Sequence, residues 1–279
     1  MNNILITIIL SINLFAYDIQ ELRKDFFYNV VSKQLLKISN NSELRKAIKI
    51  RKKQSILSVD DIQRYKKIIF KNINKRNIKN DEYFSVVNLQ RQIYSILIYV
   101  KKEDKLYLIG SDLIASGDMQ REVEIKYGED HYFDTPTGIY EVKKGWRSTG
   151  KYKDKEKTIQ SYGSKGRFVY HFGNMKQSRL NSFIKGKKIS NKKDYYTIDD
   201  TLNFAIHSYN LKDPNYKLGV KASHGCVRMS DELNSFLDSN LVLHKNFYKN
   251  KRWKLTYSYE PKNIKNIDLK GSYLIIIEK

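Results

Sequence analysis

The 279-residue chain has little cysteine, proline or glycine: one Cys, 3 Pro and 13 Gly. A single cysteine excludes an intramolecular disulfide and any zinc site built from several cysteines. So few prolines and glycines exclude collagen-like and low-complexity proteins. Hydrophobic residues make up 41% of the chain and aromatic residues 13%, which is enough to bury a core and excludes a wholly disordered protein. The length allows one large domain or two small ones.

Long hydrophobic segments are also scarce, and the main apolar run extends from Ile4 to Ala16. This run is short for a bilayer span but typical of the hydrophobic region of a secretory signal peptide. We therefore expect residues 1–16 to be a signal peptide and the protein to be exported to the periplasm or cell envelope. The alternative is an apolar first helix of the fold, because the usual Lys or Arg is missing before the run.

Negative charge is in deficit, with 52 Lys and Arg against 30 Asp and Glu, a formal net charge of +22. Such an excess can indicate nucleic-acid binding. The basic residues are spread along the chain, however, and no recognition helix, zinc finger or aromatic RNA-binding motif is present. We expect no nucleic-acid partner. In an exported protein the charge would instead attract anionic envelope polymers.

Residues 17–92 are predicted to form a small α-helical N-terminal region. Apolar residues spaced three or four apart from Ile19 onward indicate an amphipathic helix. A break at Asn40–Ser42 precedes a second predicted helix, and Ser58 with the two following aspartates begins a third that ends near Asn80. No residue types that carry chemistry cluster here, so we interpret this region as a packing or spacer module.

Residues 93–279 show short apolar or aromatic runs separated by Gly, Asn, Asp and Lys, which are typical of β-strands. Segments 95–100 and 105–110 are predicted to form a hairpin, and further strands are expected at 138–142, 167–172, 203–209, 254–259 and 272–278. One helix beginning at Ser230 interrupts them. The predicted fold class is α+β, a mostly β domain with one main helix, preceded by the small α-helical N-terminal region.

The segment 203–232 contains the only cysteine, Cys226, and two of the five histidines, His207 and His224. A thiol is a strong nucleophile only as the thiolate, and a neighbouring imidazole can take its proton. His207 ends an apolar run and is expected at a strand terminus, whereas Cys226 is expected in a polar loop immediately before a helix. A lone cysteine is often a small buried hydrophobe, but these polar neighbours favour a reactive one.

The surroundings of Cys226 also suggest how a reaction would be supported. Backbone N–H groups around Gly225 can form an oxyanion hole, because glycine allows close approach. Arg228 and the start of the helix at Ser230 add positive potential that favours the thiolate. One thiol with scattered histidines is weak evidence for a metal site, and we expect no metal and no organic cofactor.

His207, followed after fifteen residues by SHGCVRM (223–229), resembles the signature of the L,D-transpeptidase catalytic domain, also called the YkuD domain. TPTGIYEV (135–142) resembles a strand of that family, and ILIYVKKEDKLYLIG (96–110) resembles its opening hairpin. The resemblance covers about residues 93–279, which we expect to be the catalytic domain.

The resemblance implies that Cys226 is the nucleophile, that His207 is its general base, and that the backbone carbonyl of Ser208 orients His207. The family commonly has Gly at the position of Ser208, but either residue supplies a carbonyl. Backbone N–H groups of His224, Gly225 and Cys226 would line the oxyanion hole.

The remaining loop and cleft positions are less closely matched. Ser223 and Arg228 would support the loop or bind a substrate carboxylate. A looser match places Tyr170, His171 and Asn174 in the substrate cleft, with aromatic packing in a strand as the alternative for Tyr170.

The activity implied is that of a peptidoglycan L,D-transpeptidase, with tetrapeptide stem peptides as donor and an amine as acceptor. The alternative is an L,D-carboxypeptidase, in which water is the acceptor. About 40 residues follow the predicted helix, too few for the extra C-terminal domain of related trimming enzymes, and this favours transfer. A third hypothesis is a basic binding module with a degenerate catalytic domain, and the presence of both Cys226 and His207 argues against it. The sequence does not indicate an oligomeric state.

Overall fold

The computed structural model describes residues 18–37, 46, 49, 53, 55–119, 133–154, 157–160, 162–181, 183–184, 187–209, 218–246, 264–265 and 268–278. The expected signal peptide, most of the predicted helix after Ser42 and the predicted strand 254–259 lie outside these residues. No helix in the described part of the chain is both long enough and apolar enough to cross a membrane.

The described helices lie near the N-terminus and after the Cys226 loop. They are α1 (Ile19–Phe26), which continues through the π-helical turn η1 (Phe27–Ser32) into α2 (Lys33–Lys37), then α4 (Val59–Arg76) and α5 (Asp231–Ser239). Two short 3₁₀ turns are η2 (Lys101–Glu103) and η4 (Lys192–Asp194).

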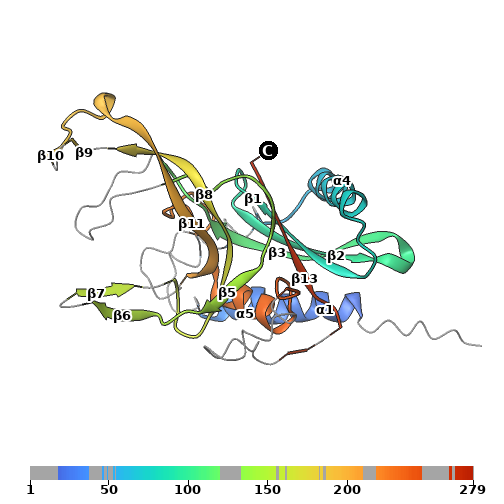
Figure 1. The fold of residues 1–279 in the computed structure, drawn as a ribbon. Coiled ribbons are helices and arrows are strands. Elements are labelled where there is room, and N and C mark those ends of the chain that lie inside the picture. The colour runs from blue at the N-terminus through green and yellow to red at the C-terminus, as the bar shows by residue number, and fades with distance from the viewer. Residues whose placement is uncertain are drawn as a thin grey trace, which may run out of the picture.

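Strands dominate the rest of the described chain. They are β1 (Glu82–Asn88), β2 (Ile93–Val100), β3 (Lys105–Ala115), β4 (Gly138–Glu141), β5 (Lys144–Arg147), β6 (Lys151–Asp154), β7 (Lys157–Gln160), β8 (Phe168–Asn181), β9 (Phe183–Ile184), β10 (Lys187–Lys188), β11 (Tyr196–Tyr209), β12 (Val227–Ser230) and β13 (Gly271–Ile277). In the described part of the chain, nine of these strands form one curled sheet in the order β4-β13-β1-β2-β3-β12-β11-β8-β5. The pairs β6–β7 and β9–β10 extend from it as small hairpins (Figure 1). The α+β fold class is confirmed.

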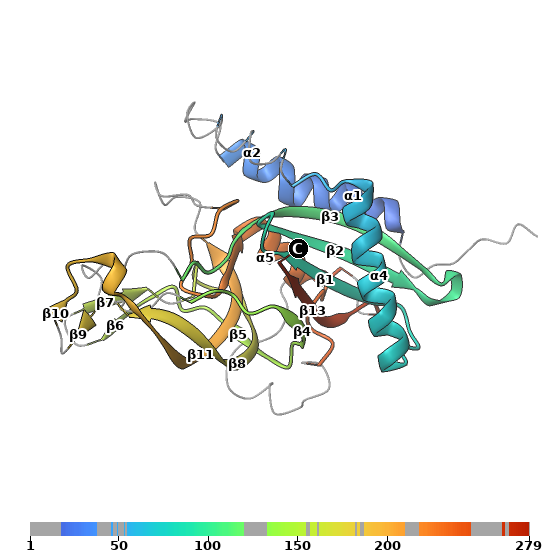
Figure 2. The same cartoon turned by 90° about the horizontal axis from the view of Figure 1, so that it is seen from above.

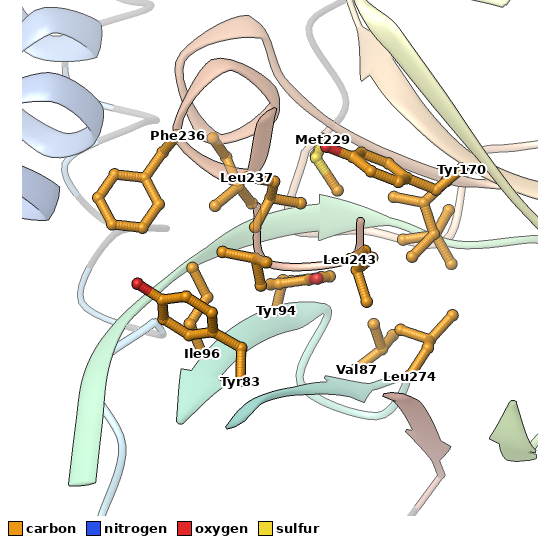
Figure 3. Packing of buried hydrophobic residues seen from close by; sticks show 14 of the residues in the cluster. Tyr83, Val87, Tyr94, Ile96, Tyr170, Met229, Phe236, Leu237, Leu243 and Leu274 are labelled. Carbon is orange, nitrogen blue, oxygen red and sulfur yellow. The ribbon is translucent and has the colours of Figure 1, made fainter. Parts of the chain in front are cut away.

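Helices cover both faces of the sheet at β1 and β2. Alternate residues point to opposite faces, as the period of two in a strand requires. Tyr94 and Ile96 face α1 and α5, whereas Leu97 faces α4. Figure 3 shows Phe236 and Leu237 of α5 over Tyr94 and Ile96. Every position of β2 is therefore buried, which explains why this strand is apolar or aromatic at every position except Ser95.

The N-terminal helix lies along β3 (Figure 2). Asp18 caps it by accepting a hydrogen bond of 2.7 Å from the Gln20 N–H. Phe26 packs against Gly110, where a Cβ would come within 2.3 Å of the ring. The Arg23 side chain donates to the Leu108 carbonyl at 2.8 Å. Because β12 pairs with β3 only at Ile114 and Ala115, the earlier part of β3 has no strand on that side. The helix covers this part of β3, which would otherwise expose unpaired backbone groups.

The sequence predictions for the elements agree with the structure in type more than in extent. The predicted hairpin is β2–β3, and the predicted helix starts at Ser58 and Ser230 are both observed N-caps. The helix from Ser58 ends earlier than predicted, at a left-handed Asn77. Residues 82–92, which the sequence placed in the helical region, instead form β1 and its turn into β2. The sequence marked the end of the preceding helix near Asn80, but without Gly or Pro between β1 and β2 it gave no signal that a first strand of the sheet begins at Glu82.

Candidate active site

Strand pairing brings Cys226 and His207 to one face of the sheet. β11 and β12 are parallel, with Ile206 beside Val227 and His207 beside Arg228. Cys226 comes one residue before Val227, so it lies beside Ala205. Val227 is buried in the core on the opposite face. Because side chains alternate along a strand, Cys226, Arg228 and His207 share the other face. Strand spacing and rise place the Cα atoms of Cys226 and His207 roughly 8 Å apart, within reach of their side chains.

Cys226 lies immediately before β12, and α5 begins only after that strand. This corrects the prediction of a loop leading directly into a helix. Its thiol is half-buried, with Sγ 4.0 Å from the Asn203 carbonyl oxygen. Burial raises the pKa of the Cys226 thiol, against the opposing effects of the Ala205 backbone and of the Arg228 charge. The resting residue is therefore a thiol, and it needs a base to become a nucleophile.

His207 is suited to act as that base. Its ring is buried, at 7% exposure, and Nδ1 lies 2.9 Å from the Ser208 carbonyl oxygen. A carbonyl only accepts, so Nδ1 carries the proton and Nε2 has a free lone pair. Burial, with the Arg228 charge adding to it, lowers the pKa of His207 to about 3, while the Ser208 carbonyl opposes this shift. The imidazole is neutral at neutral pH.

Ser208 is itself held by a neighbouring loop. Gly163, at a φ of 71°, packs so closely that a Cβ there would lie 2.0 Å from the Ser208 carbonyl oxygen. The Ser164 N–H donates to the Ser208 Oγ at 3.0 Å. Where the resemblance led us to expect Gly, this serine thus anchors the loop that lies against the carbonyl orienting His207.

Aromatic residues form a wall beside His207 that the sequence did not predict. The Tyr162 ring meets the His207 ring edge-on at a centroid distance of 5.4 Å. Trp146 meets Tyr162 in the same way, also at 5.4 Å. These side chains come from β5 and from the loop before β8, and their sequence shows no pattern that would connect them with His207.

The backbone between Ser223 and Cys226 forms a hydrogen-bonded turn. The Ser223 Oγ accepts from the Gly225 N–H at 3.1 Å and donates to the Cys226 carbonyl. Gly225 has a φ of 129°, and a Cβ there would lie 2.8 Å from the Phe204 ring. The prediction that the Gly225 N–H lines an oxyanion hole is therefore corrected, because this N–H donates its hydrogen bond to the Ser223 Oγ. The remaining candidates for that role are the N–H groups of His224 and Cys226.

Thr135 ties the turn to the rest of the fold. Its Oγ1 donates to the Gly225 carbonyl at 2.7 Å and accepts from the Gly117 N–H at 2.8 Å. A Cβ on Gly117 would come within 2.7 Å of the Gly225 Cα. The TPTG segment resembled the family in sequence, and the structure shows that its first threonine holds the Cys226 turn.

Arg228 supports the same turn from the site face. One guanidinium nitrogen lies 3.2 Å from His224 Nδ1, which must accept, and another donates to the Ala222 carbonyl at 3.4 Å. The guanidinium also lies over the Tyr209 ring at 5.4 Å. Of the two roles considered for Arg228, these contacts favour loop support over binding of a substrate carboxylate.

The three predicted cleft residues divide between the two faces of β8. Tyr170 is fully buried in the core beside Phe168 and His244, so its prediction as a cleft residue is wrong and its packing role is correct. His171 pairs with Ala205 on the site face, and its Nε2 donates to the Asn174 Oδ1 at 2.9 Å.

Within the described residues, no three His, Cys, Asp or Glu side chains are grouped to hold a metal. A hollow of about 650 Å³ lies between η1, α5 and the loop 164–167, but neither Cys226 nor His207 lines it. The candidate site is therefore the surface around the Cys226 thiol and the His207 ring.

Comparison with known families matches residues 82–239 to YkuD, the L,D-transpeptidase catalytic domain. The match covers more than half of the chain, and the chain belongs to this family. The matched segment begins at the first residue of β1 and ends at the last residue of α5.

Comparison with individual proteins adds little beyond the family. No curated protein sequence matches the chain. Among solved structures, the crystal structure of the helical cell shape determining protein Pgp2 from Campylobacter jejuni matches at 13% identity and a TM-score of 0.31. That match covers 72% of this chain and 49% of the other, so the chain spans about half the length of Pgp2.

Proposed function

We propose that the protein is an exported peptidoglycan L,D-transpeptidase that uses Cys226 as its nucleophile. The observation that carries the proposal is the pairing of β11 with β12, which puts a neutral, oriented His207 on the same face as the Cys226 thiol. Family membership supports the reaction class. The excess positive charge supports a location among anionic envelope polymers.

The first step forms an acyl-enzyme. Cys226 Sγ attacks the carbonyl carbon of the third residue of a tetrapeptide stem, a diamino acid, while His207 Nε2 takes the thiol proton. Backbone N–H groups of His224 and Cys226 stabilise the oxyanion. The carbon–nitrogen bond to the terminal D-alanine then breaks, and His207 gives its proton to the departing amine. The products are a thioester on Cys226 and free D-alanine.

The two neutral partners suit this concerted transfer. With the thiol pKa raised and the imidazole pKa lowered, a resting thiolate–imidazolium pair is disfavoured. The proton therefore moves as the carbon–sulfur bond forms, when negative charge has already developed on the substrate oxygen. The Ser208 carbonyl stabilises the imidazolium that this creates.

The second step transfers the acyl group. An amine on the diamino acid of a neighbouring stem attacks the thioester, His207 accepts the amine proton, and Cys226 is released as a thiol. With water in place of the amine, the same site is an L,D-carboxypeptidase and the product is a tripeptide.

The decisive experiment is incubation of the purified protein with disaccharide-tetrapeptide, followed by mass spectrometry. We expect D-alanine release together with cross-linked dimers. Tripeptide monomers without dimers would establish the carboxypeptidase instead. Cys226→Ala is the matched control, and D-alanine release by that variant at the wild-type rate would refute Cys226 as nucleophile. A wild-type protein that releases no D-alanine and forms no adduct with a carbapenem would refute both activities.

A further inference from the structure

We propose that the N-terminal helix positions the catalytic strand β12, and that Gln34 is the positioning residue through which it acts. This inference rests on the proposed function in so far as β12 carries the turn containing Cys226. It gives the N-terminal region a role in the chemistry, in place of the spacer role considered from the sequence.

Gln34 is at the centre of a buried hydrogen-bond network. Its Nε2 donates to the Asp112 Oδ2 at 2.5 Å and to the Ser230 Oγ at 2.7 Å. The Ser230 hydroxyl donates to the same Asp112 oxygen at 2.9 Å and accepts from the Leu233 N–H at 3.1 Å. A carboxylate oxygen only accepts, which assigns the amide nitrogen of Gln34 to this side.

The network is closed to solvent. Gln34 and Ser230 are 0% exposed and Asp112 is 1% exposed. Inside a protein, hydrogen bonds to a charged acceptor are strong and directional, and leaving such an acceptor unsatisfied is costly. The amide thus fixes the distance between the three elements that supply these residues, α2, β3 and β12.

The position of Ser230 explains why this matters for the site. Ser230 is both the last residue of β12 and the N-cap of α5, four residues after Cys226. The strand β12 pairs with β11 on one side and with β3 on the other, where only two residue pairs are formed. Gln34 bridges the two strands next to this short pairing, so it reinforces the weakest ladder that holds the Cys226 turn.

The docking of the helix gives Gln34 a rigid base. Phe26 lies against Gly110 of β3 and meets Phe236 of α5 edge-on, with ring centroids 5.2 Å apart. The helix therefore contacts β3, which supplies Asp112, and α5, whose N-cap is Ser230. A shift of the helix would be transmitted to β12 through Asp112 and Ser230.

The amide is suited to geometry rather than to stability. The Gln34 Oε1 is buried with no hydrogen-bond partner among the described residues. An apolar side chain of similar size would avoid that penalty but would lose both donated bonds. Asp112 keeps the hydrogen bond from the Ser230 hydroxyl when Gln34 is replaced, so we expect the replacement to affect the site more than the fold.

The first test compares Gln34→Leu with Gln20→Leu, a change at an exposed glutamine of the same helix. In the full chain, Gln34→Leu should lower kcat for D-alanine release about tenfold with KM within twofold of wild type. Hydrogen exchange of the backbone amides of residues 225–233 should become at least about fivefold faster, while exchange in β2 stays unchanged. Gln20→Leu should match wild type in all three measurements.

The proposal is overturned if Gln34→Leu keeps wild-type kcat and wild-type exchange at 225–233, or if exchange rises equally in β2. If the wild type releases no D-alanine, the proposed function fails while the exchange measurement still decides the role of Gln34.

A second variant, Gln34→Glu, covers the case in which Gln34→Leu does not fold. At pH 8 its carboxylate would repel Asp112, whereas at pH 5.5 a protonated carboxyl can donate to it. Exchange at 225–233, taken relative to wild type at each pH, should return to within twofold as the pH falls. A ratio that does not change with pH would refute the positioning role.

Discussion

The two halves of the curled sheet differ in what covers them. At β13, β1 and β2, helices pack on both faces, and β1 and β2 are buried at every position. At β12, β11 and β8, one face joins the core while the other carries Cys226, His207 and His171. One half of the sheet is therefore a scaffold on both faces, whereas the other half is a scaffold on one face and carries the candidate site on the other.

The largest expected effect on activity without an effect on stability is that of Cys226→Ala. We expect D-alanine release to fall by at least about 10³-fold, because the proposed nucleophile is removed. The free energy of unfolding should stay within about 1 kcal/mol of wild type, since the thiol is only half-buried. Product analysis and urea unfolding measure the two quantities. A variant that loses activity only because it unfolds would contradict this separation of roles.

In the scaffold half the expectation is reversed. Leu97 is fully buried between the sheet and α4, so Leu97→Ala should lower the free energy of unfolding by about 2–5 kcal/mol. Activity of the folded fraction should change less than twofold. Leu36→Ala is the control, because Leu36 is 71% exposed and its loss should change stability by less than about 0.5 kcal/mol. Equal losses in the two variants would contradict the assignment of Leu97 to the core.

Acid should separate the two halves further, because the buried His207 lies in the half that carries the candidate site. The pKa of His207 is about 3 in the folded protein, against about 6.5 in an unfolded chain. Between these values the unfolded chain binds a proton that the folded protein does not. The free energy of unfolding should therefore fall as pH drops from 6.5 towards 3, by up to about 1.4 kcal/mol per pH unit from this residue.

Urea unfolding of wild type and His207→Gln at pH 4, 5, 6 and 7 measures this slope. The variant should lose stability less steeply as the pH falls. Parallel curves for the two proteins would show that His207 is not buried and neutral in the folded state.

The smallest effect is expected at the aromatic wall. Tyr162→Ala removes the ring that contacts His207, and a contact of this kind is worth about 0.5–1.5 kcal/mol. We expect kcat to fall by about three- to tenfold. Tyr162→Phe keeps the ring and should remain within twofold of wild type. If both variants lose activity equally, the hydroxyl rather than the ring is responsible.

The parts of the site that could be predicted are those encoded within a short segment. His207 lies in β11 and Cys226 immediately precedes β12, the parallel strand that pairs with β11, so a local signature is enough to find both. The cap at Ser230 is likewise local, because the hydroxyl bonds to a backbone N–H three residues on. Local hydrogen bonding and strand periodicity can be read directly from the order of residues.

The parts that could not be predicted depend on register between distant strands. A β-bulge at Phe204–Ala205 shifts the pairing with β8, and this decides that His171 faces the site and Tyr170 the core. Tyr162 and Gly163 reach His207 and Ser208 from a loop more than forty positions earlier in the chain. Neither arrangement leaves a pattern within any one segment.

By itself the sequence singled out Cys226 and His207 as the candidate pair, and it determined the family and a mostly β domain with one main helix, because these follow from local spacing. Only the tertiary structure decided which face each side chain takes, that Ser223 engages the Gly225 N–H, and that Gln34 reaches Ser230 across 196 positions of sequence. The physical reason is that a local pattern sets what a segment can form, whereas packing and pairing between distant segments set where its side chains meet.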